Sequence, residues 1–250
     1  MSVVVVNMKK ASLNENEIKH YYHSIKLKGF DEAGQLKLLN SKVLVIGVGG
    51  LGSAVLPLLV SSGVGHIGIV DDDIVSLNNL PRQTLYNVKD IDKPKVEVAK
   101  KHLRLMNPGV KIKAYKMRLN EENAKEIIKG YQLVIDCTDN FETKFLINDI
   151  CVLLKKPFIT GGVDDYKGQV MTYIPKISKD FKSLFSELPI NIEEKYKVDD
   201  EGIYPVIVGI IGNIISSECL KYLTGIGEVL INKLLVVDLL ENRFEIFKIE

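Results

Sequence analysis

Residues 43–52 read VLVIGVGGLG, four apolar residues that run straight into a glycine-rich turn. An apolar stretch with the character of a helix follows, from residue 51 to about residue 60. A buried parallel strand, a glycine turn and a helix in this order form the phosphate-binding unit of nucleotide sites, because the helix N-terminus offers unpaired N–H groups to an anion. The same pattern also occurs as a tight turn without a ligand. The rest of the chain has to decide between these two interpretations.

The four glycines of this turn are candidate nucleotide-binding residues. We expect Gly47 to permit the tight turn, Gly49 to let a phosphate approach the backbone, and Gly52 to let the helix pack closely on the strand. Gly50 belongs to the same phosphate-binding turn.

The composition is that of an ordinary soluble protein of 250 residues, with 46% hydrophobic and 26% charged residues. A formal net charge of +1 gives no reason to expect nucleic acid or a membrane as a partner. The three cysteines are too scattered for a disulfide framework, which favours a reducing compartment. The opening residues do not read as a signal peptide, and the longest apolar run, residues 206–211, is far too short to span a bilayer. We therefore expect a cytoplasmic protein.

Strand-like and helix-like stretches alternate through residues 41–167, which we expect to form the nucleotide-binding core. The predicted strands are residues 43–46, 67–70, 110–116, 131–136 and 157–160, and the predicted helices are residues 51–62, 94–106, 121–129 and 141–154. This alternation predicts an α/β fold with a Rossmann-like, mostly parallel sheet and helices on both faces.

The pattern changes in residues 168–250. A strand at 169–174, a charged crossing segment at 175–202, an apolar helix at 206–223 and a hairpin of strands at 234–239 and 244–249 predict a mixed C-terminal extension of the sheet. The helix is apolar nearly all round, which predicts a subunit interface as well as a core. We expect residues 1–250 to form a single domain, with residues 1–40 as an N-terminal arm and helices.

Ligands of open α/β sheets bind at the carboxyl ends of the strands. Asp71 follows a strand at about the distance from the glycine turn where an acidic residue holds ribose hydroxyls; a solvated acidic loop is the alternative. Arg82 could make a bidentate phosphate contact. Lys95 follows Pro94 in the first turn of a helix, where a cation opposes the helix dipole. A bound polyphosphate explains this lysine better than helix stability does, and an ordinary surface lysine is the alternative.

Asp139 and Asn140 follow the strand at residues 131–136. Asp139 could hold magnesium and Asn140 could contact a nucleotide, while either residue could instead cap the helix at 141–154. A carboxylate near Arg82 and Lys95 makes sense if a metal bridges the phosphates. Together these groups describe a site for Mg-ATP.

Five ordered motifs resemble the MoeB/ThiF/HesA family, the ubiquitin-activating-enzyme-like adenylyltransferases that act on sulfur-carrier proteins. They are GVGGLG at residues 47–52, VDDD at 70–73, NNLPRQ at 78–83, KPKVE at 93–97 and CTDN at 137–140. The resemblance extends from about Tyr21 to Leu223.

By that resemblance, Asp71 binds ribose and Asp139 serves Mg²⁺. The resemblance also assigns phosphate contacts to Asn79, Arg82 and Lys95, and catalysis to Arg82, Lys95 and Asp139. Asp73, Asn78, Gln83 and Asn140 lie in the same motifs and are included in the nucleotide site.

Members of this family join the C-terminal Gly-Gly carboxylate of a small β-grasp, ubiquitin-like protein to AMP and release pyrophosphate, and they are typically homodimers. We therefore expect an adenylyltransferase that uses ATP and Mg²⁺ and has such a carrier as its partner. The pathway of the carrier stays open.

The chain also departs from the family pattern. Relatives commonly hold structural zinc with two Cys-x-x-Cys pairs, but the first pair would fall near Asp180 and Ser183 and the second is missing, so we do not expect zinc. A cysteine of many relatives aligns with about Val198, which puts a covalent thiol step in doubt. The arginine of the relatives' N-terminal arm, often presented to the neighbouring subunit's ATP, corresponds to His23. We include His23 in the nucleotide site; a histidine hydrogen-bonded within the arm is the alternative.

The sequence leaves two other functions open. A non-catalytic scaffold that binds nucleotide or carrier is favoured by the missing cysteines and opposed by Arg82, Lys95 and Asp139. A nicotinamide-dependent oxidoreductase is permitted by the glycine turn and opposed by the phosphate-binding cations.

Overall fold

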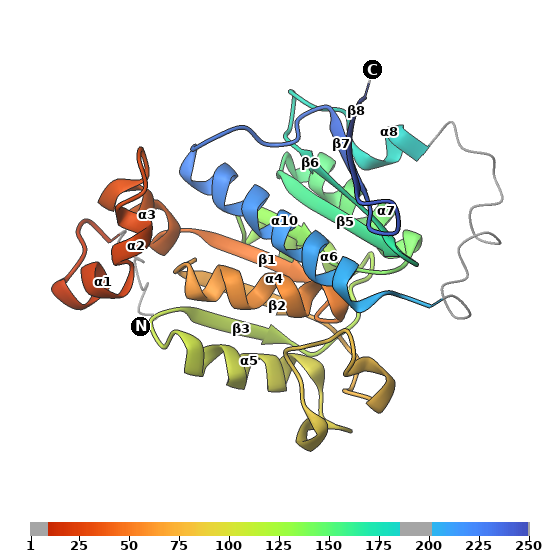
Figure 1. The fold of residues 1–250 in the computed structure, drawn as a ribbon, viewed down its shortest axis with the longest axis horizontal. Helices are drawn as coiled ribbons and strands as arrows, with labels where there is room; N and C mark the ends of the chain where they lie inside the picture. Colours follow the sequence, from red (N-terminus) through yellow and green to blue (C-terminus); the bar gives the residue numbers. More distant parts are fainter. Residues whose placement is uncertain (1–9, 186–201, 250) are drawn as a thin grey trace.

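The computed structural model describes residues 10–185 and 202–249, and the strands in this part of the chain form one eight-stranded sheet (Figure 1). The strand order is β3-β2-β1-β4-β5-β6-β7-β8. Strands β3 to β5 are parallel neighbours, whereas β6, β7 and β8 are added antiparallel. The predicted α/β class, with a mostly parallel sheet and a mixed C-terminal extension, is confirmed.

The predicted elements appear in the predicted order, and a short helix at Phe181–Phe185 lies within the segment predicted to be an irregular crossing. The strands are β1 (Lys42–Ile46), β2 (His66–Val70), β3 (Lys111–Tyr115), β4 (Leu133–Asp136), β5 (Phe158–Asp164), β6 (Lys167–Tyr173), β7 (Lys233–Asp238) and β8 (Arg243–Lys248). The helices are α1 (Glu15–His20), α2 (Tyr22–Ile25), α3 (Asp31–Leu39), α4 (Gly50–Ser61), α5 (Lys95–Met106), α6 (Ala124–Lys129), α7 (Phe141–Leu154), α8 (Phe181–Phe185) and α10 (Pro205–Thr224).

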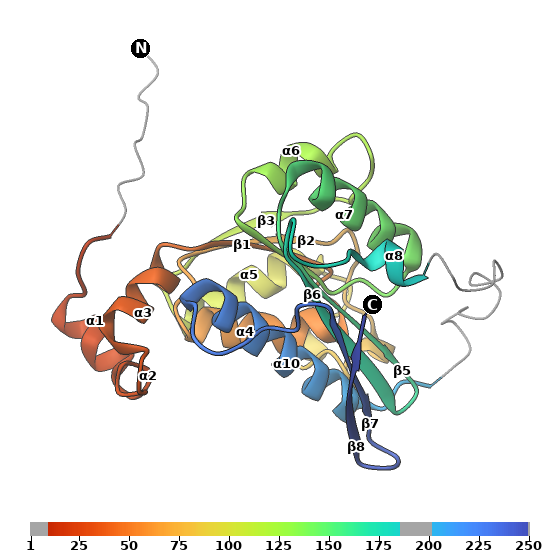
Figure 2. The ribbon, with the colours of Figure 1, turned by 90° about the horizontal axis from the view of Figure 1, so that it is seen from above.

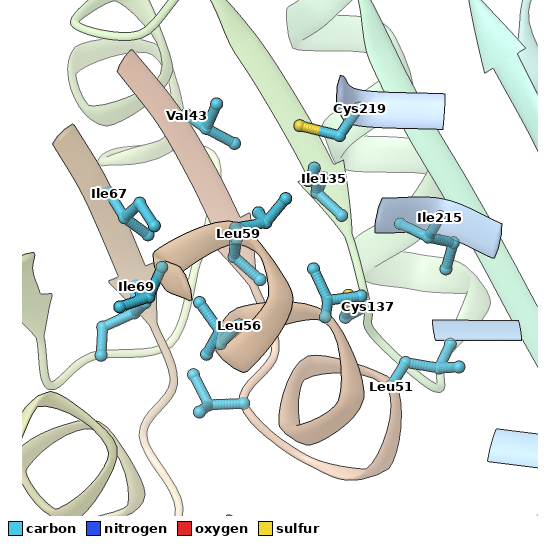
Figure 3. Close-up of a cluster of buried hydrophobic side chains, with 14 of the residues drawn as sticks. Val43, Leu51, Leu56, Leu59, Ile67, Ile69, Ile135, Cys137, Ile215 and Cys219 are labelled. Atoms are coloured by element: carbon cyan, nitrogen blue, oxygen red, sulfur yellow. The ribbon is translucent and has the colours of Figure 1, made fainter. Parts of the chain in front are cut away.

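Helices cover both faces of the sheet, and the residues of β1 show why. Val43 and Val45 belong to a core that includes α4, α5 and α10, whereas Leu44 and Ile46 belong to a second core with α6 and α7. A strand buried on both faces has to be apolar at every position. Figure 2 shows the two helix layers on opposite sides of the sheet. Figure 3 shows the first core, where side chains from β1, β2, β4, α4 and α10 meet.

Helix α10 packs on α4, β5 and β6. Among the described helices, α10 is the one that is long and apolar enough to cross a membrane. The uninterrupted apolar run at residues 206–211 had not indicated a helix of this kind. The α10 residues Ile207, Ile211 and Ile215 are fully buried, and an added Cβ on Gly212 would stand 2.5 Å from the Cβ of Ala54 on α4. These contacts make α10 a core helix of this fold.

Several predicted boundaries differ from the structure. Helix α6 begins at Ala124 rather than residue 121, because Asn120 and Asn123 form a turn in which the Asn120 side chain accepts the Asn123 N–H at 3.1 Å. Strand β5 continues past residue 160 to Asp164, because its second half pairs with β6 in a hairpin. Strand β6 begins at Lys167, so the sheet runs without interruption across the boundary drawn between core and extension.

The helices α1 to α3 lie beside the amino end of β1 (Figure 1). Tyr21, between α1 and α2, accepts a hydrogen bond of 2.8 Å from Asn107, the residue that follows α5. The arm therefore packs at the edge of the sheet opposite to the carboxyl ends of the parallel strands.

Candidate functional site

A cavity of about 890 Å³ lies at the carboxyl ends of β1, β2, β4 and β5, next to the first turns of α4, α5 and α7. The predicted site residues that line it are Gly47, Gly49, Gly50, Asp71, Asp73, Asn78, Arg82, Gln83, Lys95, Asp139 and Asn140. The cavity continues along the sheet to β6 and β7, where Gln169, Leu234 and Val236 line it. Parallel strands thus bring together groups from five separate motifs at one edge of the sheet.

The glycine turn has the close approaches expected of it. Gly47 has a φ of +89°, and an added Cβ would stand 2.7 Å from the carbonyl oxygen of Cys137. An added Cβ on Gly52 would stand 2.2 Å from the Gly47 carbonyl oxygen, so Gly52 is needed for packing. Gly49, which caps α4, faces the cavity, and its nearest neighbour at an added Cβ is the Gln83 amide nitrogen at 3.5 Å. Gly47 and Gly52 are therefore required by the packing of the turn, whereas Gly49 leaves room for a ligand.

This difference predicts opposite results for two alanine variants. Gly52→Ala should destabilise the fold by about 1–3 kcal/mol or more, because the new methyl group overpacks the turn. Gly49→Ala should stay folded but weaken ATP binding by about tenfold, or about 1.4 kcal/mol, because the methyl group occupies the space next to the backbone. Thermal unfolding and calorimetric titration with ATP measure both effects. Equal losses of stability in the two variants would contradict this division of roles.

The peptide of Val48, inside the turn, is held from both sides. Its N–H donates to the Asp71 carboxylate at 2.7 Å, and its carbonyl oxygen accepts from the Tyr86 hydroxyl at 2.7 Å. The other Asp71 oxygen accepts the Asp73 N–H at 2.9 Å. Burial raises the pKa of Asp71, although the Val48 N–H and the Lys95 ammonium stabilise its ionised form and oppose this shift. Asp71 thus supports the glycine turn as well as lining the cavity.

Lys95 lies in the first turn of α5 and is buried, not an ordinary surface lysine. Its ammonium donates to the Asp73 carboxylate at 2.8 Å, and its backbone N–H donates to the Asp73 carbonyl oxygen at 2.9 Å. The Asp73 side chain is 65% exposed, so this ion pair stands at the cavity wall rather than in the core. The ion pair fixes the position of a cation at the cavity wall, where an anionic ligand could meet it.

Arg82 and Gln83 approach the cavity from the loop that follows β2. The Arg82 guanidinium donates to the Asn78 carbonyl oxygen at 2.9 Å, which leaves other N–H groups for a ligand. Gln83 is 4% exposed, and within the described part of the chain its side-chain oxygen has no hydrogen-bond partner. Gln83 lines the cavity, and its amide nitrogen is the atom nearest to an added Cβ on Gly49, at 3.5 Å.

Asp139 and Asn140 have different roles in the loop before α7. The Asn140 side-chain oxygen accepts the Thr143 N–H at 2.9 Å, so Asn140 is the cap of this helix. The Asp139 carboxylate is exposed, and its one recorded hydrogen bond among the described residues is a long one of 3.5 Å, from the Asn140 amide. Carboxylate oxygens are the ligands that Mg²⁺ prefers, and Asp139 could therefore hold this ion.

Three predicted site residues do not line the cavity. Gly52 lies beneath it, and Asn79 uses its side chain within its own loop, donating to the Asn78 side-chain oxygen at 3.2 Å. His23 lies on α2, where its ring meets that of Tyr22 edge-on at 5.5 Å, at the opposite edge of the sheet. Within one chain, His23 is therefore not brought to the cavity.

Several residues that line or support the cavity were not predicted from the sequence. Lys144 on α7 is buried and lines the cavity, where it pairs with Asp136 at the end of β4 at 3.0 Å. Lys144 is the one basic residue of α7, and this was an available signal. Arg118, which follows β3, also lines the cavity, and Tyr86 supports the glycine turn. These two had no local signal, because their roles depend on neighbours from other motifs.

The three cysteines lie apart and are buried: Cys137 follows β4, Cys151 is on α7 and Cys219 is on α10. Burial raises the pKa of each of these thiols. Asp180 and Ser183, where relatives' first zinc pair would fall, form a helix start in which the Asp180 carboxylate accepts the Ser183 N–H at 2.8 Å. The position near Val198 lies outside the described residues.

The fold and the cavity define a nucleotide-binding α/β protein, and the comparisons with known proteins identify its family. The sequence matches the ThiF family over residues 21–250, and the chain belongs to this family. It is 38% identical over 235 residues to the sulfur carrier protein adenylyltransferase of Thermus thermophilus, covering 92% of this chain and 86% of that protein. It is 36% identical to the adenylyltransferase and sulfurtransferase MOCS3 of Drosophila virilis, covering 96% of this chain. The chain spans about half the length of MOCS3, 53%.

Solved structures support the fold alone. The structure of Escherichia coli MccB with ATP superimposes with a TM-score of 0.81 at 21% identity, covering 96% of this chain and 72% of that one. PaaA superimposes with a TM-score of 0.81 at 23% identity, covering 98% and 77%.

Proposed function

We propose that this chain catalyses the ATP-dependent adenylylation of the C-terminal Gly-Gly carboxylate of a small ubiquitin-like sulfur-carrier protein, with release of pyrophosphate. The observation that carries the proposal is that the glycine turn, Lys95, Arg82 and Asp139 line one and the same cavity. A relative of 38% identity that matches along 86% of its own length is a sulfur carrier protein adenylyltransferase, and its name gives the carrier as the substrate class.

In the proposed reaction, the terminal carboxylate of the carrier attacks the α-phosphorus of ATP. The new bond joins a carboxylate oxygen to this phosphorus, the bond to the bridging oxygen of the β-phosphate breaks, and pyrophosphate leaves with its electron pair. The residues of this chain do not form covalent bonds in this step. Their work is to align the two substrates and to offset charge that grows on the leaving group.

Each group has a place in that scheme. The N–H groups at the start of α4, around Gly49 and Gly50, would bind phosphate oxygens. Asp71 would accept hydrogen bonds from the ribose hydroxyls with the lone pairs not used by Val48 and Asp73. Lys95 and Arg82 would contact the phosphates, with Lys95 held in place by its ion pair with Asp73. The part of the cavity along β6 and β7 leaves room for an extended C-terminal tail.

Asp139 would hold Mg²⁺, since its exposed carboxylate supplies oxygen ligands at the cavity wall. When bound, the ion would offset the negative charge of the phosphates. Zinc has no place in the proposal, because the positions of the relatives' first cysteine pair are Asp180 and Ser183.

We further propose a cytoplasmic homodimer. Ile210 and Ile214 of α10 are half-buried in the single chain, which supports further burial against a second copy. His23 lies too far along the sheet to serve its own cavity, so its proposed role at the nucleotide requires the partner's site. Light scattering of the purified protein tests the dimer, and a monomer at micromolar concentration would remove His23 from the active site.

ATP–pyrophosphate exchange tests the central proposal. Each small Gly-Gly-ending protein of the same genome is added to the purified chain with ATP, Mg²⁺ and labelled pyrophosphate. We expect label to enter ATP with one such carrier, and not with the same carrier shortened by its two final glycines. ATP binding without exchange for any carrier would favour the non-catalytic scaffold, and preferential binding of NAD would favour an oxidoreductase.

A further inference from the structure

A buried ion pair lies directly behind the proposed magnesium residue. Asp136, the last residue of β4, is 1% exposed, and its carboxylate accepts four hydrogen bonds. One oxygen accepts the Thr138 N–H at 3.0 Å and the Thr138 hydroxyl at 2.6 Å. The other accepts the Thr160 hydroxyl at 2.6 Å and the Lys144 ammonium at 3.0 Å. A buried carboxylate is stable when it is paired and hydrogen-bonded in this way.

The donors of Lys144 are also accounted for. Its ammonium donates to the Gly161 carbonyl oxygen at 2.8 Å and to Asp136, with a longer contact of 3.4 Å to the Thr160 hydroxyl. An ammonium has three N–H donors, and each has a protein acceptor here. Lys144 lines the cavity, but its ammonium hydrogen bonds go to acceptors within the protein and not to the cavity. Its role is therefore to position other groups rather than to contact a substrate.

The pair joins three elements and one loop. Asp136 and Thr160 are register partners on β4 and β5, and Lys144 lies in the first turns of α7. Thr138 lies in the loop that carries Asp139. The two hydrogen bonds that Thr138 donates to Asp136 depend on the position of the Asp136 carboxylate. Asn140 ends the loop by capping α7. The loop is thus anchored on both sides of Asp139.

We propose that Lys144 is a positioning residue for the metal site: by neutralising Asp136 it fixes the Thr138–Asn140 loop and hence the Asp139 carboxylate. The inference rests on the proposed role of Asp139 in Mg-ATP binding. Removal of Lys144 leaves Asp136 as a buried carboxylate without a cationic partner. The carboxylate then shifts or draws in water, and the two Thr138 hydrogen bonds lose their geometry.

The test compares Lys144→Met, Lys144→Arg and a control, Lys221→Met. Lys221 on α10 also pairs with a buried carboxylate, that of Glu218, away from the cavity. At fixed ATP, Mg²⁺ is titrated and nucleotide binding is followed by calorimetry. We expect Lys144→Met to raise the half-saturating Mg²⁺ concentration by about 10-fold, the scale of losing a partner that orients a metal ligand. Lys144→Arg should recover most of this loss, and Lys221→Met should stay within about twofold of the parent protein, because its lost ion pair lies away from the metal site.

A second measurement needs neither metal nor carrier. Hydrogen–deuterium exchange should show faster exchange of the peptide that covers residues 137–143 in Lys144→Met, and not in Lys221→Met. If Lys144→Met does not fold, Thr138→Val replaces it, because that variant keeps the ion pair and removes one of the two side-chain anchors of the loop. The same two changes, of smaller size, are expected there.

A Mg²⁺ titration and an exchange rate of the loop that both match the parent protein, in a folded Lys144→Met or Thr138→Val, would overturn the inference. Loss of thermal stability alone would show a purely structural ion pair and would overturn it as well. Failure of pyrophosphate exchange with every carrier, together with a shifted Mg²⁺ titration, would reject the proposed function while supporting this inference.

Discussion

Replacing Lys95 with alanine should lower the rate of ATP–pyrophosphate exchange by about 10²–10³-fold, and Arg82→Ala should do the same. This loss corresponds to about 2.7–4 kcal/mol of transition-state stabilisation, the scale of one preorganised charged contact. Lys95 is suited to this role because Asp73 holds its ammonium at the cavity wall. In the alanine variant, water would take the place of the ammonium and would have to reorient as charge develops in the transition state, whereas the ammonium is already in position.

The matched control is Lys93→Ala. Lys93 lies two residues earlier, is exposed, and contacts Asp90 at 3.9 Å rather than the cavity. The Lys93→Ala variant should keep the rate of ATP–pyrophosphate exchange within about twofold of the parent, since surface ion pairs of this kind contribute little. Loss of Lys95 should also leave the fold intact, because its partner Asp73 is largely exposed and stays solvated. Exchange within about threefold of the parent for both Lys95→Ala and Arg82→Ala would reject the assignment.

Asp139→Asn should abolish most magnesium-dependent turnover and leave the free energy of unfolding almost unchanged. The carboxylate is exposed and does not cap α7, so the fold does not depend on its charge. Removing a metal-ligand charge instead weakens the binding of the ion that offsets the phosphates. The measurement is the exchange rate across a Mg²⁺ titration, with chemical denaturation of the same samples.

Asn140→Ala provides the contrasting variant. It removes the cap that accepts the Thr143 N–H and should cost about 1 kcal/mol of stability. The two neighbouring residues thus separate metal binding from helix capping. Full activity of Asp139→Asn at low Mg²⁺ concentration would show that this carboxylate does not serve the ion.

The parallel core was predictable because its signals are local. A strand buried on both faces has to be apolar throughout, as β1 is, and the positive φ of Gly47 excludes most other residues at the turn. The order of β-strands and α-helices then follows from hydrophobic periodicity. The start of a helix was predicted less accurately where polar side chains determine it, as at the Asn120–Asn123 turn before α6.

The residues that line the cavity were predictable in part for a related reason. Parallel strands carry their carboxyl ends to one edge, so Asp71, Lys95 and Asp139 could be placed together from motif order alone. Lys144 escaped notice because its meaning depends on Asp136 and Thr160, which meet it across two strands and a helix. Gln83 could be named from its motif, but its burial and its unmatched oxygen depend on the packed loop.

The sequence by itself determined the α/β class, the glycine turn and the set of charged residues at the strand ends, since each of these is written in a short segment. Only the tertiary structure decided that Asn140 rather than Asp139 caps α7, that Asp73 holds Lys95, and that His23 lies at the far edge of the sheet. These outcomes depend on distances between residues that are remote in the chain or compete for one backbone group. Such distances are set when the sheet and its helices pack, and a linear pattern does not contain them.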